Sequence, residues 1–289
     1  MHSVPAPVPQ PPMTRRRVRR LAVARTAATL VTASWMFVIA ACGVNIFSDK
    51  DDVNLGQQLD AEIRANPKEY PILKNRPDVK AYVKGITASI LNSPEVKKRG
   101  IYAYEVEIIH DDKTVNAFCT PGGYIYVYTG LLKFLDNEAA LAGVMGHEIA
   151  HAELRHATKR MSAAYGVQIM LAVALGQNPS MVEQIAANLF TNLGFLKNSR
   201  DDEMESDNYS MMYLRGTDYY PGAIRYFFEK IGSQGKGGTG SFEKLFLTHP
   251  PSDERLNNVS NKMREWSIPD PTDAQLFAAR YNEMKRKLP

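Results

Sequence analysis

Residues 147 to 151 read His-Glu-Ile-Ala-His, which places two imidazoles and a carboxylate within five positions. Residues four apart on an α-helix are separated by about 40° around the axis and one turn along it, so His147 and His151 can converge on one tetrahedral metal ion. Glu148 is displaced by about 100° and can reach a water molecule at the site instead of the ion. This spacing predicts a zinc site in which Glu148 transfers protons.

The residues around this motif predict the helix that must carry it, over residues 137 to 160. Asp136 or Asn137 can cap the helix, and Glu138 brings a negative charge to its positive end. Apolar residues then recur at helical spacing and predict one buried face: Leu141, Val144, Met145, Ile149 and Ala152. His156 points about 140° away from His151 on a continuous helix, so we expect this third histidine to belong to the scaffold.

A catalytic zinc ion needs a third protein ligand and keeps one position for water. A metzincin takes this ligand from a glycine-containing extension of the motif, but residues 152 to 157 read AELRHA, without glycine at the required place. In the remaining arrangement a later helix supplies a carboxylate. Glu203 and Asp207 share a helix face, so one can bind the metal while the other orients a ligand imidazole. Glu205 points away from both, and we expect it to be solvated.

The other elements predict an α+β fold that is mainly helical. Residues 105–110, 114–120 and 124–130 predict three strands of a small mixed or antiparallel sheet, with the turn 121–123 before the third strand. The glycine-rich segment 232–241 is either a solvated linker, which we favour, or a flap beside a site. Helices are expected at 53–66, 77–92, 137–160, 162–175, 180–194, 200–215, 221–231, 252–266 and 271–287.

Residues 1 to 41 have the three parts of an export signal, namely an arginine-rich start, an apolar run and small residues before Cys42. The apolar run is about fifteen residues long, which is short for a membrane span of about twenty. Residues 39 to 42 read Ile-Ala-Ala-Cys and resemble the bacterial lipobox, in which the cysteine becomes lipidated. We therefore expect a lipoprotein signal peptide at 1–41, a tether at 42–52 and one domain at 53–289. An uncleaved signal anchor and ordinary cleavage are the alternatives.

The formal charge of +4 comes from that first segment, which holds six arginines and no acid. The remaining chain has 29 basic and 31 acidic residues, so a nucleic-acid partner is not indicated. Both main interpretations place the domain outside the cytoplasm. Once Cys42 is lipidated, Cys119 has no partner for an intramolecular disulfide. By resemblance to bacterial sorting rules, Gly43 favours the periplasmic side of the outer membrane.

Several segments together resemble the successive motifs of metallopeptidase family 48. They are NAFCTPGGYIYVYTGLL at 116–132, HEIAH at 147–151 with RH at 155–156, SRDDEMESD at 199–207 and THPPSDER at 248–255. This family includes the HtpX-like heat-shock proteases, the CaaX-prenyl protease and the Oma-type mitochondrial protease. The resemblance implies one zinc ion and a gluzincin-type fold with three or four strands beside the HEIAH helix. Because no apolar stretch of membrane-spanning length follows Cys42, the chain resembles the soluble, lipid-anchored bacterial branch.

The resemblance also implies roles for residues outside the helix. It places the third zinc ligand on Glu203 and the family aspartate on Asp207, with Ser206 in place of the usual alanine. His249 would stabilise the oxyanion or cap the zinc, and Arg255 would support the cleft. Taken without the family pattern, His249 and Arg255 fit a proline-bounded turn and a surface ion pair.

The strand after the Pro-Gly-Gly turn lies beside the cleft in this family, and gluzincin substrates add to such an edge as an extended strand. The resemblance therefore implies a substrate groove bordered by Gly123, Tyr124, Tyr126 and Tyr128. From the residues alone, the three tyrosines are one face of a strand that meets its neighbours.

The predicted function is a zinc endopeptidase anchored at the periplasmic side of the outer membrane through Cys42. Its substrates, inferred from the family alone, are misfolded or stalled envelope proteins. One alternative is a latent or chaperone-like lipoprotein that holds outer-membrane clients, its zinc site blocked by His249. A zinc hydrolase of cell-wall peptides is a weaker alternative, because no segment resembles a glycan-binding module. The sequence does not indicate an oligomeric state.

Overall fold

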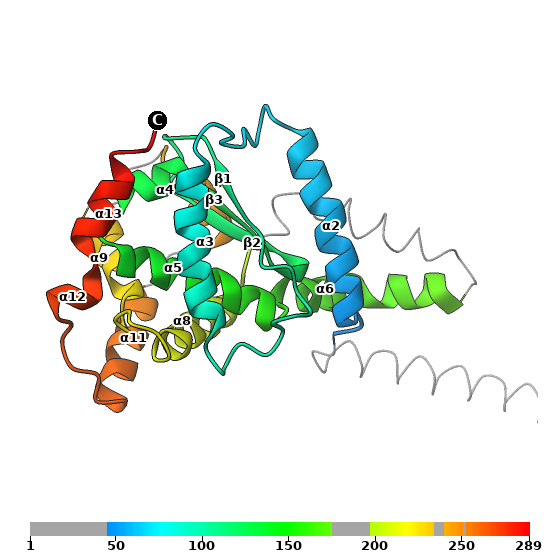
Figure 1. The fold of residues 1–289 in the computed structure, drawn as a ribbon. Coiled ribbons are helices and arrows are strands. Elements are labelled where there is room, and N and C mark those ends of the chain that lie inside the picture. The colour runs from blue at the N-terminus through cyan, green and yellow to red at the C-terminus, as the bar shows by residue number, and fades with distance from the viewer. Residues whose placement is uncertain (1–44, 175–196, 234–239, 251–252) are drawn as a thin grey trace, which may run out of the picture. The chain divides into compact units, whose positions relative to one another are not determined.

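A mixed sheet of three strands lies beside the helix of the HEIAH motif (Figure 1). Its strands are β1 (Val106–Ile109), β2 (Ala117–Thr120) and β3 (Tyr124–Tyr128). The order is β1-β3-β2, and β3 pairs in parallel with β1 and antiparallel with β2. A short 3-10 turn, η1 (Pro121–Gly123), connects β2 to β3 and requires glycine because residues 122 and 123 have φ values of 72° and 85°. The prediction of a small mixed sheet is confirmed.

The computed structural model describes residues 45–174, 197–233, 240–250 and 253–289. The expected signal peptide, Cys42 and the helix expected at 180–194 lie outside these residues. Among the described helices, none combines the length and the apolar character needed to cross a membrane. The helices are α2 (Asp49–Ala65), α3 (Pro77–Leu91), α4 (Thr129–Phe134), α5 (Glu138–Glu153), α6 (His156–Ala174), α8 (Arg200–Leu214), α9 (Ile224–Ser233), α10 (Glu243–Thr248), α11 (Asp253–Glu265), α12 (Asp273–Leu276) and α13 (Ala278–Lys285).

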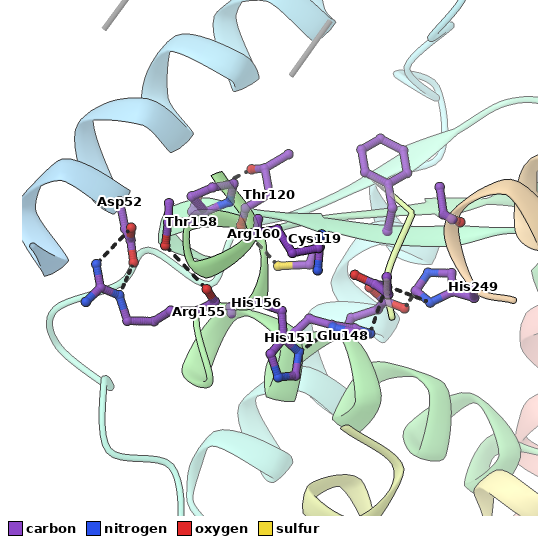
Figure 2. A pocket seen from close by; sticks show the side chains of 16 residues that line it. Asp52, Cys119, Thr120, Glu148, His151, Arg155, His156, Thr158, Arg160 and His249 are labelled. Carbon is purple, nitrogen blue, oxygen red and sulfur yellow. Dashed lines mark hydrogen bonds and ion pairs between the residues drawn. The ribbon is translucent and has the colours of Figure 1, made fainter. Parts of the chain in front are cut away.

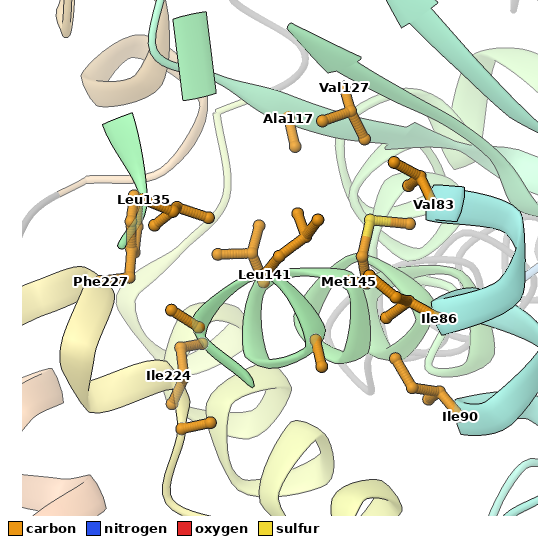
Figure 3. Close-up of a cluster of buried hydrophobic side chains, with 14 of the residues drawn as sticks. Val83, Ile86, Ile90, Ala117, Val127, Leu135, Leu141, Met145, Ile224 and Phe227 are labelled. Atoms are coloured by element: carbon orange, nitrogen blue, oxygen red, sulfur yellow. The ribbon is translucent and has the colours of Figure 1, made fainter. Parts of the chain in front are cut away.

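The two faces of the sheet are covered by different helices. Val127 and Ala117 face the cluster that α3 and α5 supply, whereas Tyr126 and Tyr128 face the other way and pack with Ile63 of α2. Figure 3 shows Leu141 and Met145 of α5 between the sheet, α3 and α9. A fully buried leucine or isoleucine stabilises the fold by about 1.5–3 kcal/mol. The α+β, mainly helical fold class is thus confirmed.

Helix α5 is buried on every side, although the sequence predicted only one buried face. All 16 of its residues are buried, including the histidines and Glu148. Two glycines allow neighbouring backbones to approach, because a Cβ on Gly143 would lie 2.6 Å from the amide nitrogen of Ile224 and one on Gly146 would lie 2.7 Å from Ser210 Oγ. The HEIAH helix is therefore the central element of the core.

A Gly143→Ala substitution is expected to destabilise the protein by about 1–3 kcal/mol, because the added methyl group collides with the backbone of α9. Gly85→Ala in α3 is a matched control, since its Cβ would meet nothing within 4 Å. That control should stabilise by about 0.5–1 kcal/mol, because alanine loses less entropy in a helix. Urea unfolding measures the free energy of unfolding of both variants. Equal stabilisation by the two substitutions would contradict the close packing at Gly143.

The helix expected over residues 137 to 160 is in fact broken. Helix α5 ends at Glu153 and α6 begins at His156, because Arg155 adopts a left-handed conformation with φ 61°. Contacts with a distant segment hold this residue: its Nε and Nη2 donate to Asp52 over 2.6 and 3.1 Å, and Nη2 also donates to the carbonyl of Phe47 over 2.6 Å. Long-range contacts therefore hold the side chain of the residue at which the helix is broken.

The expected tether at 42–52 is too long, because the described part of that segment packs against the domain. Asn45 Nδ2 donates to Thr158 over 2.9 Å, and the amide of Ile46 donates to Ser162 Oγ over 3.0 Å. Ser48 then caps α2 and forms a capping box with Asp51. The described fold therefore includes residues 45–52, and α2 begins four residues earlier than expected.

Candidate metal centre

Four buried side chains from three helices converge beside the sheet. His147 and His151 lie on successive turns of α5, Glu203 lies in the first turn of α8, and His249 directly follows α10. Their exposed fractions are at most 8%. One donor atom from each of the four lies within 4.8 Å of the others. The structure therefore brings together the three predicted ligands and adds His249 as a fourth donor.

The distances between these donors fit a zinc ion. Ligands about 2.0–2.1 Å from a tetrahedral zinc lie about 3.3 Å from one another. His151 Nε2 is 2.9 Å from His147 Nε2 and 3.3 Å from Glu203 Oε1. His249 Nδ1 is 3.0 Å from Glu203 Oε1 and 3.4 Å from His147 Nε2. Two imidazoles and a carboxylate are a usual set for catalytic zinc, so this cluster can hold one zinc ion.

The electrostatic surroundings keep two of the donors, His151 and Glu203, in the forms that bind a metal. Burial, reinforced by His147, lowers the pKa of His151 well below its usual value, so this ring is neutral. Burial opposes ionisation of Glu203, but the positive charges of His249 and Arg255 outweigh it and hold the pKa of Glu203 well below its usual range. A neutral imidazole and an ionised carboxylate are the metal-binding forms of these groups.

Glu148 is buried at 2% exposure and lies next to the donor cluster without belonging to it. Its Oε1 is 3.6 Å from His249 Nε2. Burial raises the pKa of Glu148 above its ordinary value, although the nearby His249 opposes the shift. A carboxylate with a raised pKa accepts and returns a proton more readily near neutral pH. This placement agrees with the predicted proton-transfer role.

Asp207 and Arg255 form a buried ion-pair network behind the donors. Arg255 donates from Nε and Nη2 to the two oxygens of Asp207, each over 2.7 Å, and its Nη1 lies 2.5 Å from Glu203 Oε2. Asp207 Oδ1 is also 2.8 Å from His147 Nδ1. Arg255 therefore contacts two carboxylates of the centre and is not the surface ion pair that the residues alone suggested.

His156 is part of the site, contrary to the sequence-based expectation. Because α6 starts a new helix at residue 156, the imidazole turns back toward the donors and is only 1% exposed. Its Nδ1 lies 2.8 Å from His151 Nδ1 (Figure 2). Its Nε2 lies 3.2 Å from Glu205 Oε2. Glu205 is exposed, as expected, and still reaches His156 from the surface. Spacing along one helix could not reveal either contact, because α5 ends at Glu153 and α6 begins at His156.

Asn198 is a further site residue that the sequence reasoning missed. Its Nδ2 donates to Glu203 Oε1 over 2.7 Å, and the side chain is 7% exposed. Ser199, the next residue, caps α8 and forms a capping box with Asp202. This Ser-x-x-Asp pattern could have indicated the position of Asn198. It fixes Ser199 as the cap of the helix, and Asn198 directly precedes that cap.

The substrate groove expected at Gly123, Tyr124, Tyr126 and Tyr128 stays a prediction, and the strand pairing does not favour it. Strand β3 pairs on both sides, so Tyr124, Tyr126 and Tyr128 have no free backbone edge to offer. Tyr126 and Tyr128 are also buried in the cluster against α2. Gly123 packs against Tyr104, where an added Cβ would lie 3.1 Å from the backbone nitrogen. The interpretation of the tyrosines as one strand face meeting its neighbours describes Tyr126 and Tyr128 better.

Strand β2 borders the centre instead. A hollow lies beside it and is lined by Thr120, Glu148, His151, Arg160, Asn198 and His249, among others (Figure 2). A second hollow adjoins Glu148 and His249 and has apolar walls that include Val144, Ile224 and Phe227. Within the described sheet, β2 pairs only with β3, so its other backbone edge has no strand partner there.

Residues 66–263 match the model of peptidase family M48, and the chain belongs to this family. The beta-barrel assembly-enhancing protease of Escherichia coli (strain K12) is 27% identical over 257 residues, which cover 82% of this chain and 51% of that protein. Metalloprotease LoiP of the same strain is 35% identical over 155 residues, 52% of this chain and 60% of that protein. Mitochondrial metalloendopeptidase OMA1 of Arabidopsis thaliana is 33% identical over 166 residues, 56% of this chain and 33% of that protein. The predicted family is confirmed, and the chain spans about half the length of the first of these relatives.

Proposed function

We propose that this protein is a zinc-dependent endopeptidase. The observation that carries the proposal is the convergence of His147, His151 and Glu203 at zinc-like distances, with Glu148 beside them and a free strand edge at β2. Zinc, when bound, polarises the scissile carbonyl and lowers the pKa of a water molecule to about 7. The membership in peptidase family M48 supports the same reaction.

The chain's own residues have separate tasks in this reaction. The free edge of β2 aligns the substrate backbone as an added strand across the hollow. Glu148 accepts the proton of the attacking water and delivers it to the leaving amine, for which its raised pKa is suited. Asp207 and Arg255 hold His147 and Glu203 in place from behind.

The proposed substrates are misfolded or stalled proteins of the cell envelope, cleaved at the periplasmic side of the outer membrane. This proposal is supported by the name of the relative called beta-barrel assembly-enhancing protease and by the lipobox-like residues before Cys42. Lipidation at Cys42 would anchor the protein there. Metabolic labelling with a fatty acid tests the anchor, because a Cys42→Ala variant should lose the label.

The peptidase proposal is tested by incubating the purified protein with casein, first as isolated, then after a zinc chelator, and then after zinc is returned. Cleavage should stop with the chelator and resume with zinc. Mass spectrometry of the products should show cleavage at internal peptide bonds. Cleavage that continues unchanged in the metal-free protein would refute zinc dependence.

The position of His249 favours a second candidate, a latent protein that holds outer-membrane clients. Its Nδ1 lies 3.0–3.4 Å from donors on Glu203 and His147, where it can occupy the fourth zinc position. A catalytic zinc leaves that position to water. In this candidate, His249 must leave before a substrate carbonyl can enter.

We expect His249→Ala to increase casein cleavage by about 10- to 100-fold, which corresponds to an open site that is about 1–10% populated in the unaltered protein. Zinc content should stay near one ion per chain, since three ligands remain. His110→Ala, a change at an exposed histidine, is the control and should leave the rate unchanged. A fall in activity in the His249 variant would instead assign this residue to oxyanion stabilisation.

A further inference from the structure

We propose that His156 is a positioning residue of the metal site, which accepts the Nδ1 proton of His151 and thereby fixes this ring with Nε2 toward the metal. The proposal concerns metal binding and rests on the proposed zinc ligands. It does not depend on the peptidase activity. A positioning residue of this kind changes metal affinity even when no substrate is present.

The two nitrogens of the His151 ring face different partners. Nε2 faces the donor cluster, at 2.9 Å from His147 Nε2 and 3.3 Å from Glu203 Oε1. Nδ1 faces His156, at 2.8 Å from its Nδ1. The two rings stand at 74° to each other with centroids 5.0 Å apart, so the contact runs through ring edges (Figure 2).

This geometry determines where each proton lies. A neutral imidazole carries one N–H donor and one lone pair. When His151 Nε2 gives its lone pair to a metal, its proton must be on Nδ1, and the nitrogen 2.8 Å away on His156 must be an acceptor. The proton of His156 is then on Nε2, which lies 3.2 Å from Glu205 Oε2. The protons therefore point in one direction, from His151 through His156 to Glu205.

The remaining neighbours of His156 do not replace this role. Ser206 Oγ lies 3.4 Å from the same Nδ1, which is a longer contact than the one from His151. Asp202 Oδ1 lies 3.8 Å from Nε2, on the side of Glu205. Neither group lies between His156 and His151.

At the position of His156, a neutral acceptor suits this centre better than another carboxylate would. The site already contains the carboxylates of Glu148, Glu203 and Asp207, all buried. Asp207 stands behind His147, so one ligand histidine has an anionic partner and the other has a neutral one. Another buried negative charge at His156 would carry a desolvation cost that the imidazole avoids.

Two substitutions separate the proposed role from space filling. In His156→Asn, the amide oxygen lies close to the position of Nδ1 and can still accept from His151. In His156→Gln, the amide reaches the position of Nε2 and Glu205 but leaves the His151 N–H without an acceptor. Titration of the zinc-loaded protein with a chromophoric chelator measures the zinc dissociation constant of each. We expect the zinc dissociation constant to rise by about 10- to 100-fold in His156→Gln and by less than about threefold in His156→Asn.

Ser206→Ala is the matched control, since it removes the other contact to His156 Nδ1, and it should leave zinc affinity unchanged. Equal zinc affinity in the Asn and Gln variants would overturn the proposal. A second measurement needs no substitution: nitrogen-15 NMR of the zinc-loaded protein should show His156 protonated at Nε2 and not at Nδ1. A proton on His156 Nδ1 would also overturn it. Because zinc affinity and protonation are read without substrate, these outcomes are independent of whether casein is cleaved.

Discussion

Replacing Glu148 with glutamine is expected to lower the rate of casein cleavage by about 10²- to 10⁴-fold while zinc stays bound. Glutamine has the shape of glutamate, but its amide cannot accept the proton of the attacking water. Zinc should be retained because Glu148 lies outside the donor cluster. Initial cleavage rates and the zinc content of the same samples measure the two effects separately.

The control for this substitution is Glu62→Gln, which makes the same change at an exposed position of α2. Its rate and zinc content should equal those of the unaltered protein. Undiminished cleavage by the Glu148 variant would remove this residue from proton transfer. Loss of zinc together with activity would show that Glu148 holds the centre together instead.

Replacing Arg255 with glutamine is expected to destabilise the protein by about 3–5 kcal/mol, because Asp207 and Glu203 would keep two buried charges without their common partner. Both carboxylates are fully buried, at 0% exposure, so water cannot take the place of the guanidinium. The loss of stability caused by Arg255→Gln should be larger after zinc is removed, because the ion also compensates the charge of Glu203. Urea unfolding with and without chelator measures both values.

Arg76→Gln provides the comparison for a surface ion pair. Arg76 Nη2 lies 2.8 Å from Asp78 Oδ2, and the two side chains are 27% and 43% exposed. Removing such an exposed pair should have little effect on the free energy of unfolding, because solvent screens its charges. If Arg255→Gln costs no more than Arg76→Gln, the buried network does not stabilise the fold.

The parts of the site that could be predicted are those that depend on local spacing. His147 and His151 share a helix face because they are four residues apart, and their convergence follows from helix geometry. Glu203 and Asp207 have the same spacing on α8, so their relation to each other was also readable. The choice of Glu203 as the ligand required the family resemblance, because residues alone left both options open.

The parts that were missed depend on contacts between distant segments. Strand order is one of them: nothing in residues 124 to 128 indicates that β3 pairs on both sides while β2, within the described sheet, pairs only with β3. Likewise, His156 was placed on a continuous helix, and only the contacts of Arg155 with Asp52 and Phe47 explain the break. These partners lie 103 and 108 residues earlier in the chain.

The contact of Arg155 with the N-terminal segment determines where the protein can be shortened. A chain begun at residue 53, as the expected tether boundary suggests, lacks Asp52 and Phe47 and leaves the guanidinium of Arg155 without these acceptors. The helix break is then free to straighten, which moves His156 away from His151. We expect such a chain to bind zinc more weakly than one begun at residue 45, in a chelator titration of both. Equal affinities would show that the break forms without that segment.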